Sequence, residues 1–206
     1  MQNARRELSL RAGVLFGSSA AMWLVMLLDW VIPGRSAAGH GIVPRTSYGL
    51  EGIPIAPLIH SGFEHLVANT IPFLILGAII LARGISEFML VSLVTLLTSG
   101  SGTWLFGEAN TEHIGASGIV FGFFGYLVFR AVFDRRVSSI LIMLAVALWY
   151  GGTMLYSLVP AEGISWTGHF FGFAGGLAAA RLRHPRLKNA EKVKRALSVI
   201  PIIKPK

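Results

Sequence analysis

The chain contains no cysteine and few charged residues. Only 14% of its 206 residues are Lys, Arg, Asp or Glu, against roughly 25% in average soluble proteins, and 53% are hydrophobic. The missing cysteines exclude a cysteine nucleophile, an iron–sulfur cluster and a Cys-ligated zinc site. The low charge and a mean hydropathy of +0.64 argue against a soluble enzyme, a disordered regulator or a secreted disulfide scaffold. They indicate an integral membrane protein.

Six apolar stretches have the length of helices. They cover residues 12–32, 57–82, 88–106, 115–133, 138–158 and 165–182. Because about 20 residues at a rise of 1.5 Å cross the hydrocarbon core, we expect an all-α membrane protein with one six-transmembrane-helix domain in residues 1–182. Residues 183–206 are expected to form a basic cytoplasmic tail. The half-apolar connection over residues 33–56 is expected to lie in the membrane interface or to dip into the membrane.

The basic residues predict the orientation. If the N-terminus is cytoplasmic and the spans alternate, all of the 18 Lys and Arg residues except Arg35 and Arg45 fall inside, whereas most acidic residues fall outside. This positive-inside pattern predicts an even number of spans and two cytoplasmic termini, with the plasma (inner) membrane as the expected location. The pI of about 10.5 is then a consequence of topology, and no nucleic-acid partner is expected.

Polar residues gather at one depth in three of the predicted spans. They are His60, Glu64, His65 and Asn69 in the second, Gly115 to Gly118 in the fourth, and Trp166 to His169 in the sixth. All three spans enter from the outer face, so these groups share one layer, and polar groups at membrane depth usually face a cavity or the bundle interior. His60 is expected to have a structural role at the helix mouth, and Glu64 to face the aqueous rim.

Ser117 and His169 become a catalytic pair if the fourth and sixth spans pack closely. Small residues recur at four-residue spacing on both spans: Gly118 and Gly122, and Gly168, Gly172, Gly176 and Ala180. Such faces let two backbones approach, and an imidazole in contact with a hydroxyl removes its proton as the oxygen attacks a carbonyl. No acidic residue lies obviously behind His169, so a dyad is expected, with Phe121 as a candidate to orient the imidazole.

A serine nucleophile also needs donors for the developing oxyanion. Ser117 is expected at a helix N-terminus, where backbone N–H groups are free and the dipole favours negative charge. His65 and Asn69 are four residues apart on one helical face and offer a ring N–H and an amide N–H. These two side chains are therefore the candidates for an oxyanion hole.

With these residues identified, the chain resembles the rhomboid intramembrane serine proteases. Three patches carry the resemblance, His60 to Asn69, Gly115 to Gly118 and Gly168 to Gly172, and the stretch from Pro44 to Pro57 is similar to that family's outer loop. The resemblance extends from about residue 42 to residue 180.

The resemblance implies a rhomboid-like bundle with Ser117 as nucleophile, His169 as general base, and His65 and Asn69 in the oxyanion hole. It implies cleavage of membrane-protein substrates in the lipid bilayer, near the outer ends of their transmembrane segments, with no cofactor and no metal. Two positions depart from the family: Phe121 stands where related enzymes often have Tyr, and Leu81 where some members have an acidic residue.

Other interpretations use the same polar layer. A catalytically silent rhomboid-like protein that binds membrane clients is typically marked by loss of the Ser or the His, and both are present here. An ion or proton pathway favours a carboxylate deep in a span, which the sequence lacks. Metal binding by His60, His65 and His169 is disfavoured, because the neighbouring Asn69 and Ser117 are poor ligands by type.

Two other classes of intramembrane protease fit less well. A zinc enzyme needs His-Glu-x-x-His on a helix, and this chain has Glu64-His65 without a second histidine at that spacing. An aspartyl enzyme needs two intramembrane Asp residues, and the only candidates, Asp29 and Asp134, are expected at opposite membrane faces.

Overall fold

The computed structural model of the chain describes residues 2–32, 34, 36–161 and 163–199, and the side chains only as far as residue 183. The elements in this part are seven α-helices and one short 3-10 helix: α1 (Gln2–Val31), α2 (Ser47–Ile55), η1 (Ala56–Leu58), α3 (Phe63–Leu81), α4 (Ile85–Phe106), α5 (Ser117–Asp134), α6 (Val137–Tyr156) and α7 (Trp166–Val199). Within these residues the one β-type pairing is an isolated antiparallel bridge between Ile42 and His113.

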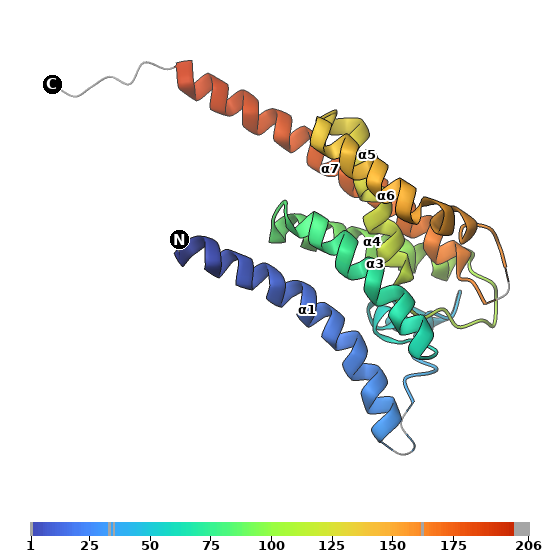
Figure 1. Ribbon diagram of the computed structural model, residues 1–206. Coiled ribbons are helices and arrows are strands. Elements are labelled where there is room, and N and C mark those ends of the chain that lie inside the picture. Colours follow the sequence, from blue (N-terminus) through green and yellow to red (C-terminus); the bar gives the residue numbers. More distant parts are fainter. Residues whose placement is uncertain (1, 33, 35, 162, 200–206) are drawn as a thin grey trace.

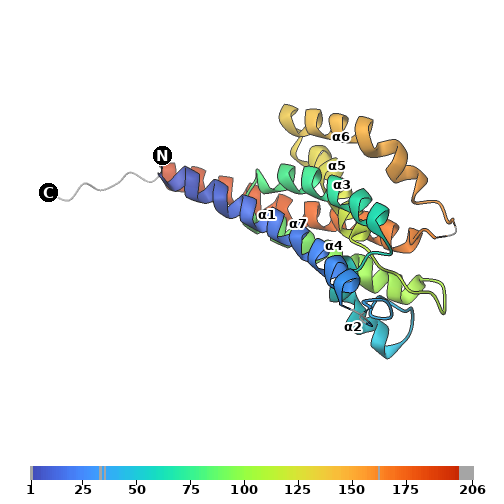
Figure 2. The same cartoon turned by 60° about the horizontal axis from the view of Figure 1, so that its bottom comes forward.

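Five helices, α1, α3, α4, α5 and α6, are long and apolar enough to cross a membrane. The prediction of an all-helical, multi-pass membrane protein is therefore confirmed. Among the described residues, α7 does not meet the same test of length and composition, so six spans and the side of the termini stay predictions. The start of α1 and the far end of α7 point toward the same side of the molecule (Figures 1 and 2).

The observed helix bounds differ most from the predicted ones in three places. α1 begins at Gln2 rather than near residue 12, and an i,i+4 ion pair between Glu7 and Arg11 supports this first part. α3 begins at Phe63, because the preceding residues form η1 and a turn with Ile59 in an extended conformation. α7 continues beyond residue 182 to Val199, so most of the predicted tail extends this helix, and residues 200–206 lie outside the described residues.

The connection before α3 contains a helix, α2, that the sequence did not predict. Thr46 caps it by accepting a hydrogen bond from the Gly49 N–H at 3.1 Å. Gly49 and Gly52 are buried, and a Cβ at either would overlap the backbone of residues 41–43. A Cβ at Gly100 of α4 would overlap the side chain of Ile53 in α2. Glycines thus let this connection fold tightly against the end of the bundle.

α5 is the central helix, and its most extensive packing is against α7. Phe123 and Tyr126 of α5 are fully buried. A Cβ at Gly172 of α7 would overlap the Gly118 carbonyl of α5, and one at Gly176 would overlap that of Gly122. The two backbones are therefore in direct contact along their small-residue faces. α1 stands at the edge of the bundle, where it packs on α3 and η1 (Figures 1 and 2).

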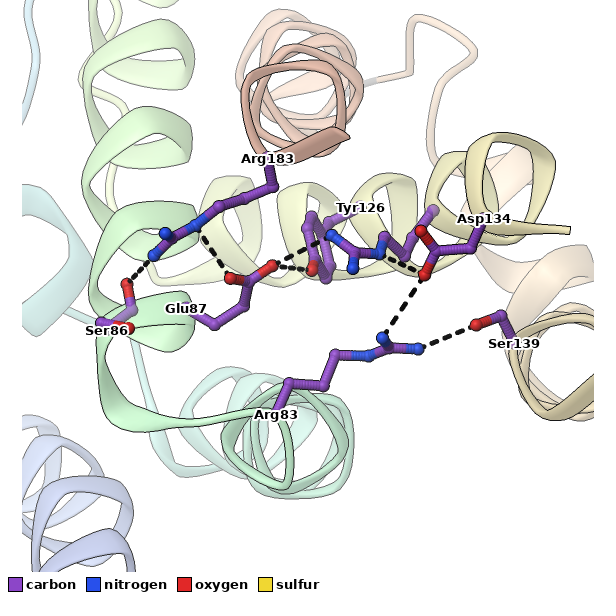
Figure 3. Close-up of polar contacts among 8 residues, drawn as sticks. Arg83, Ser86, Glu87, Tyr126, Asp134, Ser139 and Arg183 are labelled. Atoms are coloured by element: carbon purple, nitrogen blue, oxygen red, sulfur yellow. Dashed lines mark hydrogen bonds and ion pairs between the residues drawn. The ribbon is translucent and has the colours of Figure 1, made fainter. Parts of the chain in front are cut away.

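A buried network of charged side chains joins the helices at the end opposite Ser117 (Figure 3). Glu87 of α4 accepts a hydrogen bond from the Tyr126 hydroxyl and pairs with Arg130 of α5 at 3.3 Å and with Arg183 of α7 at 2.8 Å. Asp134 pairs with Arg130 at 2.6 Å. Leu81 is buried at this same end, and the carboxylates of the network come from α4 and α5 instead.

Candidate active site

Ser117 and His169 are in contact. The Ser117 Oγ atom, in the first residue of α5, lies 2.9 Å from Nε2 of His169, in the first turn of α7. His169 is only 8% exposed, so the pair is largely withdrawn from solvent. The N-terminus of α5 places unpaired backbone N–H groups and the positive end of the helix dipole beside the serine.

Close packing of the helix starts brings this pair together. A Cβ at Gly118 would overlap Oγ of Ser99 on α4, and the same hydroxyl donates a hydrogen bond to the Gly168 carbonyl oxygen at 2.8 Å. A single side chain of α4 thus contacts the residue after Ser117 and the residue before His169. A larger side chain at Gly118 would collide with this Ser99 side chain, and one at Gly168 would crowd the hydroxyls of Thr103 and Ser165.

The His169 imidazole is held on its far edge and on one face. Its Nδ1 lies 2.8 Å from the carbonyl oxygen of Ser157, just after α6. Because a carbonyl oxygen only accepts, Nδ1 carries the proton and Nε2 presents its lone pair to the Ser117 hydroxyl. The Phe121 ring stacks on the imidazole, with centroids 4.1 Å apart and planes 1° apart. The sequence indicated Phe121, but nothing in it pointed to a backbone carbonyl at residue 157.

His65 and Asn69 lie together beside the loop that leads to Ser117. Asn69 is 4% exposed, and its amide donates one hydrogen bond to the His65 carbonyl at 2.9 Å, which leaves its second N–H available. A Cβ at Gly115 would lie 2.7 Å from His65 Nε2 and 3.7 Å from Asn69 Nδ2. Gly115 has φ +102°, so glycine serves here both for its backbone conformation and for its size.

Ser61 determines which ring nitrogen of His65 carries the proton. The Ser61 N–H points to His65 Nδ1 at 3.4 Å, and the Ser61 hydroxyl lies 3.1 Å from the same nitrogen. An N–H donor at Nδ1 leaves the ring proton on Nε2, the nitrogen that faces Gly115. His65 therefore presents a donor toward the loop before the serine.

His60 lies outside α3 and ties the same loop in place. The Ala116 N–H donates to its Nε2 at 3.4 Å. Burial, with a smaller contribution from the neighbouring His65, lowers the pKa of His60 to about 4, so the ring is neutral at pH 7. Glu64 is exposed. Among the described residues, no group of three or more His, Asp or Glu side chains is arranged to hold a metal ion.

A small cavity borders Ser117. Its volume is about 30 Å³, room for about two waters, and its lining residues include the polar Ser99, Thr103, His113 and Ser165. The lining comes from the outer connection with α2 and η1, from α4, from the loop before α5, and from the starts of α5 and α7. Polar partners for a water are thus present next to the serine.

These features define a class: a multi-pass helical membrane protein with a serine and a histidine in contact between two helices. Residues 52–186 match the family model of the Rhomboid domain, and the chain belongs to the rhomboid family. The resemblance given by the sequence is therefore confirmed.

The chain is similar to proteins of several bacteria. An uncharacterized protein of Mycobacterium tuberculosis is 38% identical over 185 residues, which cover 86% of this chain and 77% of the relative. An uncharacterized protein of Mycobacterium leprae is 36% identical over 194 residues, 90% of this chain and 76% of the relative. The rhomboid protease GluP of Bacillus subtilis is 29% identical over 154 residues, 71% of this chain and 28% of GluP.

Proposed function

We propose that this protein is an intramembrane serine endopeptidase that uses Ser117 as nucleophile and His169 as general base. The observation that carries the proposal is the 2.9 Å contact between Ser117 Oγ and His169 Nε2, with the Nδ1 proton of His169 directed to the Ser157 carbonyl. This is the tautomer that accepts a proton from a serine. Membership of the rhomboid family, which includes GluP, supports the same class of reaction.

In the proposed reaction, Ser117 Oγ attacks the carbonyl carbon of the scissile peptide as its proton passes to His169 Nε2. The Ser157 carbonyl keeps its bond to Nδ1–H and stabilises the imidazolium. His169 then protonates the leaving amine, and the C–N bond breaks to leave an acyl-Ser117. A water that gives its proton to His169 attacks this ester, and Ser117 recovers its proton as the acid product leaves.

The oxyanion of each tetrahedral intermediate is proposed to lie near Gly115. His65 Nε2–H and the second N–H of Asn69 border this residue, and the N-terminus of α5 adds its dipole. The small cavity beside Ser117 supplies room for the hydrolytic water. No step of this scheme calls for a metal or a cofactor.

The proposed substrates are membrane proteins, cut near the outer ends of their transmembrane segments. A helical segment hides its peptide groups in i to i−4 hydrogen bonds, so it must unwind before Ser117 can attack. Gly and Pro weaken a helix by roughly 1–3 kcal/mol each, and we expect a preference for segments that contain them near the cleavage site. Equal cleavage of a matched segment in which Leu replaces them would contradict this preference.

Labelling in isolated membranes with a fluorophosphonate, which reacts covalently with activated serines, tests the dyad. The wild type is expected to label, and Ser117→Ala and His169→Ala are each expected to lose the label. Ser101→Ala, at an exposed position of α4, is the matched control and keeps full labelling. Labelling that persists in Ser117→Ala would refute the assignment. A folded wild type that never labels would favour the catalytically silent, client-binding alternative.

A further inference from the structure

A second contact between a histidine and a serine lies close to the first. Each of its two residues precedes a residue of the dyad by four positions. His113 precedes Ser117 by four residues, Ser165 precedes His169 by four, and His113 Nδ1 lies 2.7 Å from Ser165 Oγ. The two residue types are exchanged relative to the dyad. Both side chains are partly buried, in the loops that lead into α5 and α7.

The direction of the hydrogen bonds at His113 follows from its neighbours. The Thr111 hydroxyl donates its only proton to the Glu108 carbonyl at 2.7 Å, so its oxygen accepts from His113 Nε2–H at 2.9 Å. Nδ1 of His113 is therefore free to accept the Ser165 hydroxyl proton. Burial also lowers the pKa of His113, with Glu108 opposing this effect, and so favours the neutral ring that this chain of donors requires.

This contact is connected to both residues of the dyad through the backbone. On one side, His113 pairs with Ile42 through two backbone hydrogen bonds of 2.9 Å, which anchor the loop before Ser117 to the outer connection. On the other side, the Ser165 carbonyl accepts the His169 N–H at 3.1 Å, the first turn of α7. The imidazole of His113 thus connects the loop before Ser117 to Ser165, and the Ser165 carbonyl accepts the backbone N–H of His169.

We propose that His113 is a positioning residue whose hydrogen bond to Ser165 fixes the separation of Ser117 and His169. Small-residue packing aligns α5 and α7 along their length, and the contact between His113 and Ser165 adds a link between the two loops that lead into these helices. The inference rests on the proposed function, because it assigns a role within the same site. His113 lines the cavity beside Ser117, but its ring hydrogen-bonds to Thr111 and Ser165 and not to the dyad, and it acts through Ser165.

Four variants distinguish the hydrogen bond at Nδ1 of His113 from the hydrogen bond at its Nε2. His113→Leu removes both hydrogen bonds, and Ser165→Ala removes the partner. His113→Asn places an amide oxygen where Nδ1 lies and keeps the bond to Ser165, whereas His113→Gln places its amide near the position of Nε2 and loses that bond. We expect the rate constant of fluorophosphonate labelling to fall between tenfold and about 10²-fold in His113→Leu, His113→Gln and Ser165→Ala, because small displacements of a reacting pair have effects of this size.

Two further measurements distinguish a positioning role of His113 from a general loss of stability. They use the conservative variant His113→Asn and a double variant. His113→Asn is expected to label within about threefold of wild type, and His113→Leu with Ser165→Ala to label no more slowly than either single variant, since both remove one interaction. Glu112→Ala is the matched control. Its carboxylate ties the same loop to the N–H groups of Gly39 and Gly41 at 2.8 and 2.7 Å and not to α7. It is expected to keep the wild-type rate.

A wild-type rate in His113→Leu, or an equal loss in His113→Asn and His113→Leu, overturns the proposal. A second readout is independent of activity: ¹⁵N NMR of labelled histidines is expected to show His113, assigned from His113→Asn, with the proton on Nε2 and with Nδ1 shifted by Ser165→Ala. An Nδ1-protonated ring overturns the inference even where labelling is normal. If the wild type does not label at Ser117, the proposed function fails, and the NMR result alone then decides whether the contact exists.

Discussion

The Phe121 ring lies parallel to the His169 imidazole, with centroids 4.1 Å and planes 1° apart. Both ends of the imidazole are occupied as well, by Ser117 at Nε2 and the Ser157 carbonyl at Nδ1. Phe121 is one turn beyond Ser117 on α5, so the helix that carries the proposed nucleophile also carries the ring against which the proposed base stacks. In the proposed dyad the Nδ1 partner is a backbone carbonyl, and we expect the stacking to supply part of the orientation that a carboxylate provides in a triad.

We expect Phe121→Leu to slow fluorophosphonate labelling by roughly tenfold, because an aliphatic side chain fills the space but does not hold the ring plane. Phe121→Tyr preserves the stacked ring and is expected to stay close to wild type. The comparison of the two labelling rates, at equal amounts of folded protein, distinguishes the effect of ring stacking from the effect of side-chain volume. Loss of labelling in Phe121→Tyr, or none in Phe121→Leu, would contradict a role for stacking.

Asn69→Ala is expected to lower turnover of a transmembrane substrate by about 10²-fold, the usual cost of one oxyanion donor. The remaining contact of the Asn69 amide, to the His65 carbonyl at 2.9 Å, is within α3, so the helix itself is expected to persist. Turnover is measured as the initial rate of product release in liposomes, together with the melting temperature in detergent. An unchanged rate takes Asn69 out of the mechanism, and a rate loss that simply follows a lower melting temperature does so too.

The sequence predicted the features that have a regular spacing or that extend over long apolar stretches. Of the six spans predicted from apolar length, five correspond to helices that are long and apolar enough to cross a membrane, and four-residue spacing of glycines located the faces on which α5 and α7 meet. The order of polar residues along the chain then placed Ser117 and His169 at one depth. Each of these signals is periodic or long, and local sequence patterns report such features well.

Contacts made by loops and by backbone atoms were not predictable in this way. The Ser157 carbonyl that orients His169 carries no sequence signal, because every residue has a carbonyl. His113 and Ser165 stand in loops, where no periodicity relates one residue to a partner 52 positions away. α2 was missed since its glycines and Pro54 are weak helix formers, and packing of Gly49 and Gly52 on residues 41–43 overrides that preference.

Glu87→Ala is expected to destabilise the folded protein by about 3 kcal/mol, because it leaves the buried Arg130 with one fewer anionic partner. Figure 3 shows that the Glu87 carboxylate also faces Tyr126 and Arg183, so all three of these groups lose an acceptor together. The free energy of unfolding is measured by titration with sodium dodecyl sulfate in mixed micelles. A change below about 1 kcal/mol would show that the network contributes little.

The matched control for this network is Glu7→Ala. Glu7 pairs with Arg11 on the exposed face of α1, where its side chain is 63% exposed. Exposed ion pairs contribute about 0–1 kcal/mol, so this variant is expected to unfold nearly as the wild type does. The same charge is removed in both variants, and burial of the partner is the difference that the experiment measures.

The pH dependence of stability is expected to include a contribution from His60. Burial lowers its pKa to about 4, below its ordinary value of 6.5 in the unfolded chain. Between these values the unfolded state binds more protons, so stability is complete above pH 6.5 and falls as the pH is lowered toward 4. His60→Gln places an amide oxygen near Nε2, retains an acceptor for the Ala116 N–H and cannot titrate. Its melting temperature is therefore expected to change less with pH over this interval, and curves that run parallel to wild type would exclude His60 as the cause.

Gly172→Ala and Gly152→Ala test the close approach of α5 and α7 with one and the same change. A Cβ at Gly172 would overlap the Gly118 carbonyl oxygen, whereas a Cβ at Gly152 of α6 would meet nothing within 4 Å. In a helix without steric conflict, Ala is more favourable than Gly by roughly 0.5–1 kcal/mol, so Gly152→Ala is expected to be neutral or stabilising. Gly172→Ala must instead separate two backbones next to the dyad, and we expect lower thermal stability by about 1–3 kcal/mol together with slower labelling of Ser117. Melting curves and labelling rates of both variants check this, and a Gly172→Ala protein that melts and labels like Gly152→Ala would show that the two helices do not depend on direct backbone contact.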